Sequence, residues 1–158
     1  DRCSRCNIKA LPFFILLARL GTEMGQFKED ERGGLLATTN YRYKENRNVI
    51  QLLANGVHHT ENDTTEHQQL VHNLFRVVLQ QLKDIGLMKK HDILKYGLER
   101  HACHKDIDNY TESRFRFFID WDPVSLTRPS NCFGNLPLHR VIIDNGNIQM
   151  FQSVFKAG

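Results

Sequence analysis

The stretch GNLPLHRVIIDNGNIQMFQSVFKAG, residues Gly134–Gly158, carries the strongest structural signature in the chain. Pro137 suits the first turn of a helix, because its φ is fixed and it has no N–H to lose. The residues Asp-Asn-Gly-Asn at 144–147 favour a helix end, since they tolerate positive φ and bond their own backbone. Apolar residues at helical spacing lie on both sides of this break: Leu138, Val141, Ile142, Met150, Phe151, Val154 and Phe155. The stretch therefore predicts two short helices, with Gly158 as a C-terminal capping residue.

The two predicted helices are too short to be stable alone. Isolated helices below roughly 12–15 residues are marginal in water. Their apolar stripes therefore have to be buried against neighbouring helices that lie side by side in a row. We expect an all-α fold of stacked helical hairpins.

The same stretch resembles an ankyrin repeat, whose pattern is Gly-x-Thr-Pro-Leu-His, an inner helix, a Gly-His break, an outer helix with a paired apolar stripe, and a final glycine. The matching positions are Gly134, Pro137, Leu138, His139, Gly146, Met150, Phe151, Val154, Phe155 and Gly158. Leu136 replaces the capping threonine, and one extra residue precedes Gly146. Val141 and Ile142 replace small alanines, which implies altered stacking on the neighbouring unit. With the preceding loop, the resemblance covers residues 126–158.

This resemblance implies an ankyrin-like α-solenoid at the C-terminal end and a non-catalytic role as a protein–protein interaction scaffold. In that family the loop before the inner helix projects toward partners, and here this loop is Val124–Phe133. Arginine is enriched at protein interfaces, so Arg128 and Arg140 are the expected anchors for another protein. The full set of candidate partner-binding residues is Arg128, Ser130, Asn131, Asn135 and Arg140.

Further helical hairpins are predicted over 63–158, upstream of this repeat. The clearest helix runs over 64–85, where Asp63 and Glu66 have capping-box spacing and Gly86 follows the end. Its inward stripe is predicted to contain Leu70, Val71, Leu74, Phe75, Val78, Leu82 and Ile85. The spacing predicts two more helices, over 91–103 and 107–121. The second ends at the Asp-Pro pair that follows it, since proline forces the residue before it out of the α region.

The N-terminal part, residues 1–62, is less regular and is expected to hold short helices. Pro12 opens an apolar run, 11–18, that is expected to form a buried helix. Asn48 can cap a short helix that Asn55-Gly56 would end. The glycine pair at 33–34 indicates a turn and no phosphate loop, because no Gly-Lys-Ser/Thr follows it.

Size and charge set the broad class. The chain has 158 residues, enough for one domain with a buried core, and a mild net charge of +3. No long block of like charges favours a nucleic-acid partner, and no run of about 18 apolar residues suggests a membrane span. The four cysteines are too sparse for a disulfide scaffold, so we expect reduced thiols in an intracellular, cytoplasmic protein. Because the chain starts at Asp1 and stops where another repeat would begin, we expect a fragment of a longer protein.

Cys3-Ser-Arg-Cys6 is the basis of an alternative, a zinc-stabilised regulatory module. Two residues between thiolates let both reach one tetrahedral ion. The completing ligands would have to come from His101, Cys103 and His104. A redox dithiol lacks its preceding strand, and a signal peptide lacks its methionine and cleavage site. Ordinary thiols and surface histidines are the simpler interpretation, so no metal or cofactor is expected.

An enzyme is not expected. Catalytic sites of the nucleophilic type need a nucleophile, a base and an orienting group within reach of one another. Cys103 lies near His101 and His104 in the sequence, but no third group accompanies them. The sequence therefore predicts no catalytic residues.

Overall fold

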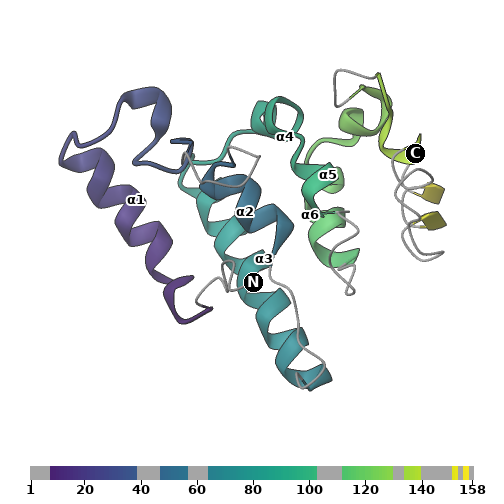
Figure 1. Cartoon of the computed structure of the whole chain (residues 1–158), viewed down its shortest axis with the longest axis horizontal. Helices are drawn as coiled ribbons and strands as arrows, with labels where there is room; N and C mark the ends of the chain where they lie inside the picture. Colours follow the sequence, from purple (N-terminus) through teal and green to yellow (C-terminus); the bar gives the residue numbers. More distant parts are fainter. Residues whose placement is uncertain are drawn as a thin grey trace, which may run out of the picture.

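The computed structural model describes residues 8–38, 47–56, 64–102, 112–129, 134–139, 151–152 and 155–156. Within these ranges the chain is mostly helical and contains no strand, which confirms the all-α fold class. The elements are η1 (Ile8–Ala10), α1 (Phe13–Glu23), η2 (Glu29–Glu31), α2 (Val49–Asn55), α3 (Thr65–Asp84), α4 (Lys90–Tyr96), α5 (Leu98–Ala102), α6 (Glu112–Trp121) and η3 (Pro123–Thr127). Figure 1 shows them as a row, with α1 at one end and the C-terminal segments at the other.

Helix α3 is the longest described element and packs against α1, α2 and α6. Its buried residues are Val71, Phe75, Val78, Leu79 and Leu82. Full burial of a side chain of this size contributes about 1.5–3 kcal/mol, so this face supplies much of the core stability. Leu70 and Ile85 were expected on the same face, but they are 58% and 44% exposed. Leu70 lies to the side of the covered face, since the adjacent Val71 is fully buried, and Ile85 comes after the last residue of the helix.

The ends of α2 and α3 follow local signals. Asn48 accepts a hydrogen bond from the N–H of Gln51 at 2.9 Å, and the Gln51 side chain accepts from the N–H of Asn48 at 3.0 Å. The sequence predicted Asn48 as the cap of this helix, but not the reciprocal hydrogen bond that the Gln51 side chain accepts. At the start of α3 the cap is Thr64, whose Oγ1 accepts from the N–H of His67 at 3.3 Å. The predicted cap Asp63 is therefore wrong by one residue.

The helix predicted over 91–103 is two helices. Gly97 adopts φ 58° and ψ 46°, which ends α4 before α5 begins at Leu98. Glycine enters this left-handed region without the steric cost of a Cβ. The apolar spacing continues across Gly97, with Ile93 and Leu98 both fully buried, so periodicity alone did not reveal the break.

Helix α1 was expected to be buried, but only one side of it is buried. Its buried residues are the small ones, Ala18 and Gly21. The backbone of Gly33 approaches so closely that a Cβ there would collide with the Ala18 carbonyl oxygen. A Cβ on Gly21 would lie 3.0 Å from the ring of Phe27. The segment after α1 therefore covers its small-residue face. Phe14 and Ile15 are partly buried against the core, and the other large apolar residues of the helix face solvent.

The C-terminal prediction is described only in part. Residues 137–139, 151–152 and 155–156 are helical. The rings of Phe151 and Phe155 stack with centroids 6.1 Å apart, as residues one helical turn apart can. The break predicted at 144–147 lies outside the described residues.

Candidate protein-interaction surfaces

The segment after α6 is a folded turn where the sequence predicted a loop. Asp122 has φ −135° and ψ 79°, outside the α region, as the following proline requires. The N–H and Oγ of Ser125 both donate to the Asp122 carbonyl oxygen, at 3.0 and 2.7 Å. Ser125 and Leu126 are buried, and Lys90 Nζ lies 3.4 Å from Asp122 Oδ1. These contacts hold the turn against the helical body.

The anchored turn leaves several side chains exposed to solvent. Val124 is 45% exposed, and Thr127, Arg128 and Pro129 are exposed after it. Thr127 Oγ1 donates to the Val124 carbonyl oxygen at 3.0 Å, which closes the turn. We call Val124 and Thr127–Pro129 the turn surface.

Two of the predicted partner-binding residues can be located. Arg128 is exposed at the end of η3, as a binding residue should be. Asn135 is half-buried just before the helical residues 137–139. Ser130, Asn131 and Arg140 lie outside the described residues, so their place in the predicted set stays a prediction.

A second surface was missed by the sequence analysis. On α1, Phe13, Leu16, Leu17 and Leu20 are 58%, 52%, 59% and 40% exposed, and Met24 just after it is 66% exposed. Arg19 and Glu23 form an ion pair of 3.8 Å along one edge of this face. A helix that is apolar all round is normally buried, which is why sequence reasoning placed it inside. The glycines at 21, 33 and 34 were the available signal that its small-residue face is the covered one.

A surface groove runs beside this face, between α1 and the C-terminal end of α3. Its first part is lined by Pro12, Ile15, Leu16, Arg19, Gln81 and Ile85. The next part is lined by Arg19, Thr22, Glu23, Ile85 and Leu87. Because both parts share Arg19 and Ile85, the groove is continuous along α1.

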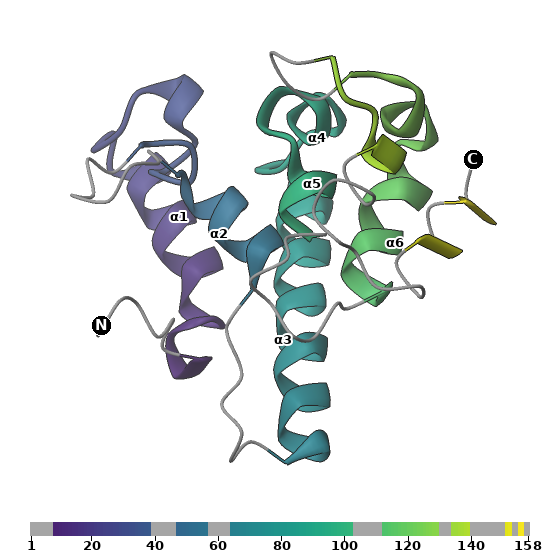
Figure 2. The same cartoon turned by 45° about the vertical axis from the view of Figure 1, so that its right-hand side comes forward.

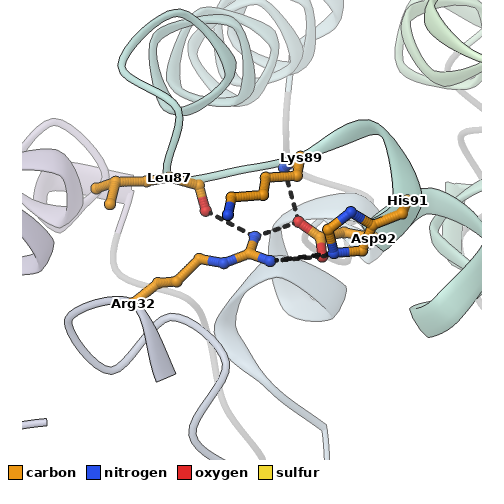
Figure 3. A network of polar contacts seen from close by, with 5 residues as sticks. All are labelled: Arg32, Leu87, Lys89, His91 and Asp92. Atoms are coloured by element: carbon orange, nitrogen blue, oxygen red, sulfur yellow. Dashed lines mark hydrogen bonds and ion pairs between the residues drawn. The ribbon is translucent and has the colours of Figure 1, made fainter. Parts of the chain in front are cut away.

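A buried ion pair fixes the segment after α1 to the body of the protein (Figure 3). Arg32 donates from both Nη atoms to the carboxylate of Asp92, with Nη2–Oδ1 at 3.0 Å, and from Nη1 to the Leu87 carbonyl oxygen at 3.1 Å. Asp92 also accepts from the N–H of Lys89 at 2.7 Å, so it caps α4 as well. Arg32 itself has φ 47°, a left-handed conformation that typically costs about 1–3 kcal/mol for a non-glycine residue. The hydrogen bonds of Arg32 and Asp92 therefore offset the cost of the strained Arg32 backbone and hold the segment after α1 against the start of α4.

Glu99 is the second unusual carboxylate. It is 0% exposed, and burial raises its pKa from 4.5 to about 7. The neighbouring Asp122 raises the pKa further, while the backbone amides of residues 99 and 100 and the charge of Arg100 offset part of the effect. Those amides lie near the carboxylate, but neither oxygen has a hydrogen-bond partner of good geometry among the described residues. A raised pKa in a cleft would suggest catalysis, but Glu99 is enclosed in the core.

His101 and Arg114 are buried too. His101 is 4% exposed, so its prediction as a surface histidine is wrong. Arg114 is fully buried and donates from Nη1 to the Ala54 carbonyl oxygen at 3.3 Å, at the C-terminal end of α2. Its guanidinium lies 5.6 Å from the ring centroid of Phe75. Both contacts suit a cation, since helix C-termini and ring faces carry partial negative charge.

The described part of the chain holds no cluster of three or more histidine, cysteine, aspartate or glutamate residues suited to a metal ion. Cys3, Cys6, Cys103 and His104 lie outside that part, so the zinc alternative concerns residues that the structure does not describe. Among the described helices, none combines the length and apolar character needed to cross a membrane.

The chain matches no protein-family model, no curated protein and no solved structure. The exposed surfaces of the chain are therefore the features from which a function can be inferred.

Proposed function

We propose that the chain is a non-catalytic scaffold that binds another protein, with its helices arranged as an ankyrin-like solenoid. The observation that supports this most is the turn surface. Buried Ser125 and Leu126 hold the turn in place while Arg128 extends into solvent. This is where the resemblance to ankyrin repeats implies a partner-binding loop.

An anchored turn is well suited to binding because little order has to be created when the partner arrives. Ordering a loop or a long side chain at an interface typically costs about 0.5–1.5 kcal/mol per immobilised side chain. The hydrogen bonds of Ser125 and Thr127 already fix this backbone. Arg128 then supplies a planar group with five donors that suits carboxylates and backbone carbonyls.

The solenoid arrangement is supported in part by the packing of the helices. They spread along a row from α1 to α6 (Figures 1 and 2), and α4 packs on α5 and α5 on α6, but α2 packs mainly on α5 and α1 packs on α3. The helical residues at 137–139 start where the ankyrin pattern places its inner helix, and Pro137 is buried. In such a row each hairpin buries its apolar face on its neighbours, which leaves the turns free for recognition.

Replacing both expected anchors tests this function. Arg128→Ala combined with Arg140→Ala should weaken binding of the partner at least about tenfold, because interface arginines often contribute more than about 1 kcal/mol each. The full chain is used as bait in an extract of its source organism, and dissociation constants are then measured for the captured proteins. Arg76→Ala, an exposed arginine on α3, is the matched control. The control should bind the partner as tightly as the original chain. If the variant that lacks both Arg128 and Arg140 also binds it as tightly, the turn surface is not the docking site.

A further inference from the structure

The outward face of α1 has a regular pattern that the proposed function does not use. Phe13, Leu17, Leu20 and Met24 follow one another at spacings of four, three and four residues, and each is at least 40% exposed. This is the spacing of the core positions of a coiled coil. We call these four residues the α1 stripe. Figure 2 shows α1 at one end of the described row of helices, and the stripe side chains on it are exposed.

Together with two neighbouring side chains, the stripe is as large as the largest apolar patch on a typical monomer. With Leu16 and Phe27, which are 52% and 42% exposed, six large side chains expose on the order of 500 Å² if each offers about 150–250 Å² in full. The largest patch on a typical monomer is about 300–600 Å² and is often functional. Covering such an exposed apolar face with another apolar surface is favourable, because it removes apolar area from water.

We propose that this cover is a second copy of the same chain, with the two α1 helices packed antiparallel. The stripe is symmetric about the point midway between Leu17 and Leu20. In an antiparallel pair, Leu17 therefore lies opposite Leu20 of the second copy, and Phe13 opposite Met24 of the second copy. A two-fold interface requires this reciprocity, in which residue i contacts j and j contacts i.

Charge around the stripe also fits a second copy. Its bordering charges, Arg19 and Glu23, have opposite signs and pair with each other at 3.8 Å, so the face presents little net charge. The whole chain carries only +3, which gives weak repulsion between copies. Antiparallel packing further opposes the two helix dipoles, whereas parallel packing would place like ends together.

The area that the two copies would bury determines how stable the dimer is expected to be. Two copies that bury this face would remove roughly 1,000 Å² in total, at the lower end of specific interfaces. Such interfaces are often weak and transient. The dimer should therefore dissociate on dilution through the micromolar range.

Sedimentation velocity of the full chain from about 1 to several hundred micromolar tests the inference. We expect a reversible monomer–dimer equilibrium. Leu17→Lys alone and Leu20→Glu alone should each weaken dimerisation at least tenfold, since each would place a charge in an apolar interface. An equimolar mixture of the two variants should dimerise again, because antiparallel packing brings the new lysine opposite the new glutamate. Phe13→Lys with Met24→Glu repeats the test at the outer pair.

Matched controls make each result decisive. Leu70→Lys changes an equally exposed leucine, 58% exposed, at the far end of α3 and should leave the dimer unchanged. Circular dichroism checks that each variant keeps its helical content.

Two results would contradict a second copy as the cover of the α1 stripe: an original chain that stays monomeric at all concentrations, or α1 variants that dimerise as strongly as the original chain. Monomeric variants that fail to combine would overturn the antiparallel register. Arg128→Ala with Arg140→Ala should not affect dimerisation, so this test is independent of the partner-binding test.

Discussion

Replacing Asp92 by alanine is expected to lower the free energy of unfolding by about 3–5 kcal/mol. Asp92 is fully buried, and it accepts hydrogen bonds from Arg32 and from the N–H of Lys89. Removing the carboxylate leaves the Arg32 guanidinium without its ion-pair partner in a nearly closed site, where its side chain is 12% exposed. An unpaired buried charge costs far more than the loss of a surface ion pair.

Urea unfolding followed by circular dichroism measures this effect, with two comparison variants. Glu23→Ala breaks the exposed Arg19–Glu23 pair, in which both side chains are 62% exposed, and should change stability by less than about 1 kcal/mol. Asp92→Asn keeps an oxygen for the N–H of Lys89 but loses the charge, so its loss should be intermediate. Amide exchange over 29–36 should accelerate in Asp92→Ala. Equal losses for Asp92→Ala and Glu23→Ala would show that the ion pair does not hold this segment.

Glu99→Gln is expected to raise the free energy of unfolding at pH 8 and to change it little at pH 4. The folded-state pKa of about 7 lies above the ordinary 4.5, so the folded protein binds the Glu99 proton more tightly than the unfolded chain. The stabilisation from that proton is complete below about pH 4.5 and is lost as the pH rises through 7. The difference between the two pKa values corresponds to at most roughly 3–4 kcal/mol, since one pKa unit is about 1.36 kcal/mol. Glutamine stays neutral and avoids this loss.

Unfolding free energies of both proteins at pH 4, 6 and 8 test the sign as well as the size. The advantage of Glu99→Gln should grow from pH 4 to pH 8. Glu23→Gln, which changes an exposed carboxylate, serves as the control and should stay within about 0.5 kcal/mol of the original chain. An advantage of Glu99→Gln that is the same at every pH would mean that the buried carboxylate does not titrate as the structure implies.

The elements that sequence reasoning predicted well have local causes. Helix α2 begins at a residue capped by Asn48, and α3 ends before Gly86 at φ 75°. Caps and glycine ends are set by a few neighbouring residues, so they can be read from the sequence. The all-α class follows from the same signals combined with apolar spacing.

The misplaced features depend on residues far apart in the chain. The outward face of α1 follows from the approach of Gly33 to Ala18, and Arg32 pairs with Asp92 across 60 positions. Glu99 and His101 carry polar side chains of types that are mostly or partly exposed in proteins, yet the fold buries both. A single sequence gives the period of a helix but not the identity of what packs on it.

Of the two candidate surfaces, one was predicted from the sequence and the other was not. Arg128 was predicted from a motif position and lies exposed beside an anchored turn. The α1 stripe was not predicted, because its residues resemble a buried helix until the covering segment is known.

Hydrogen–deuterium exchange of the chain alone and bound to its captured partner is the most direct test of the proposed scaffold role. Slower exchange on binding is predicted over 124–129 and 134–139, the turn and the first helical residues after it. Unchanged exchange there, with protection confined to α4 and α5, would contradict the proposal that the turn after α6 binds the partner.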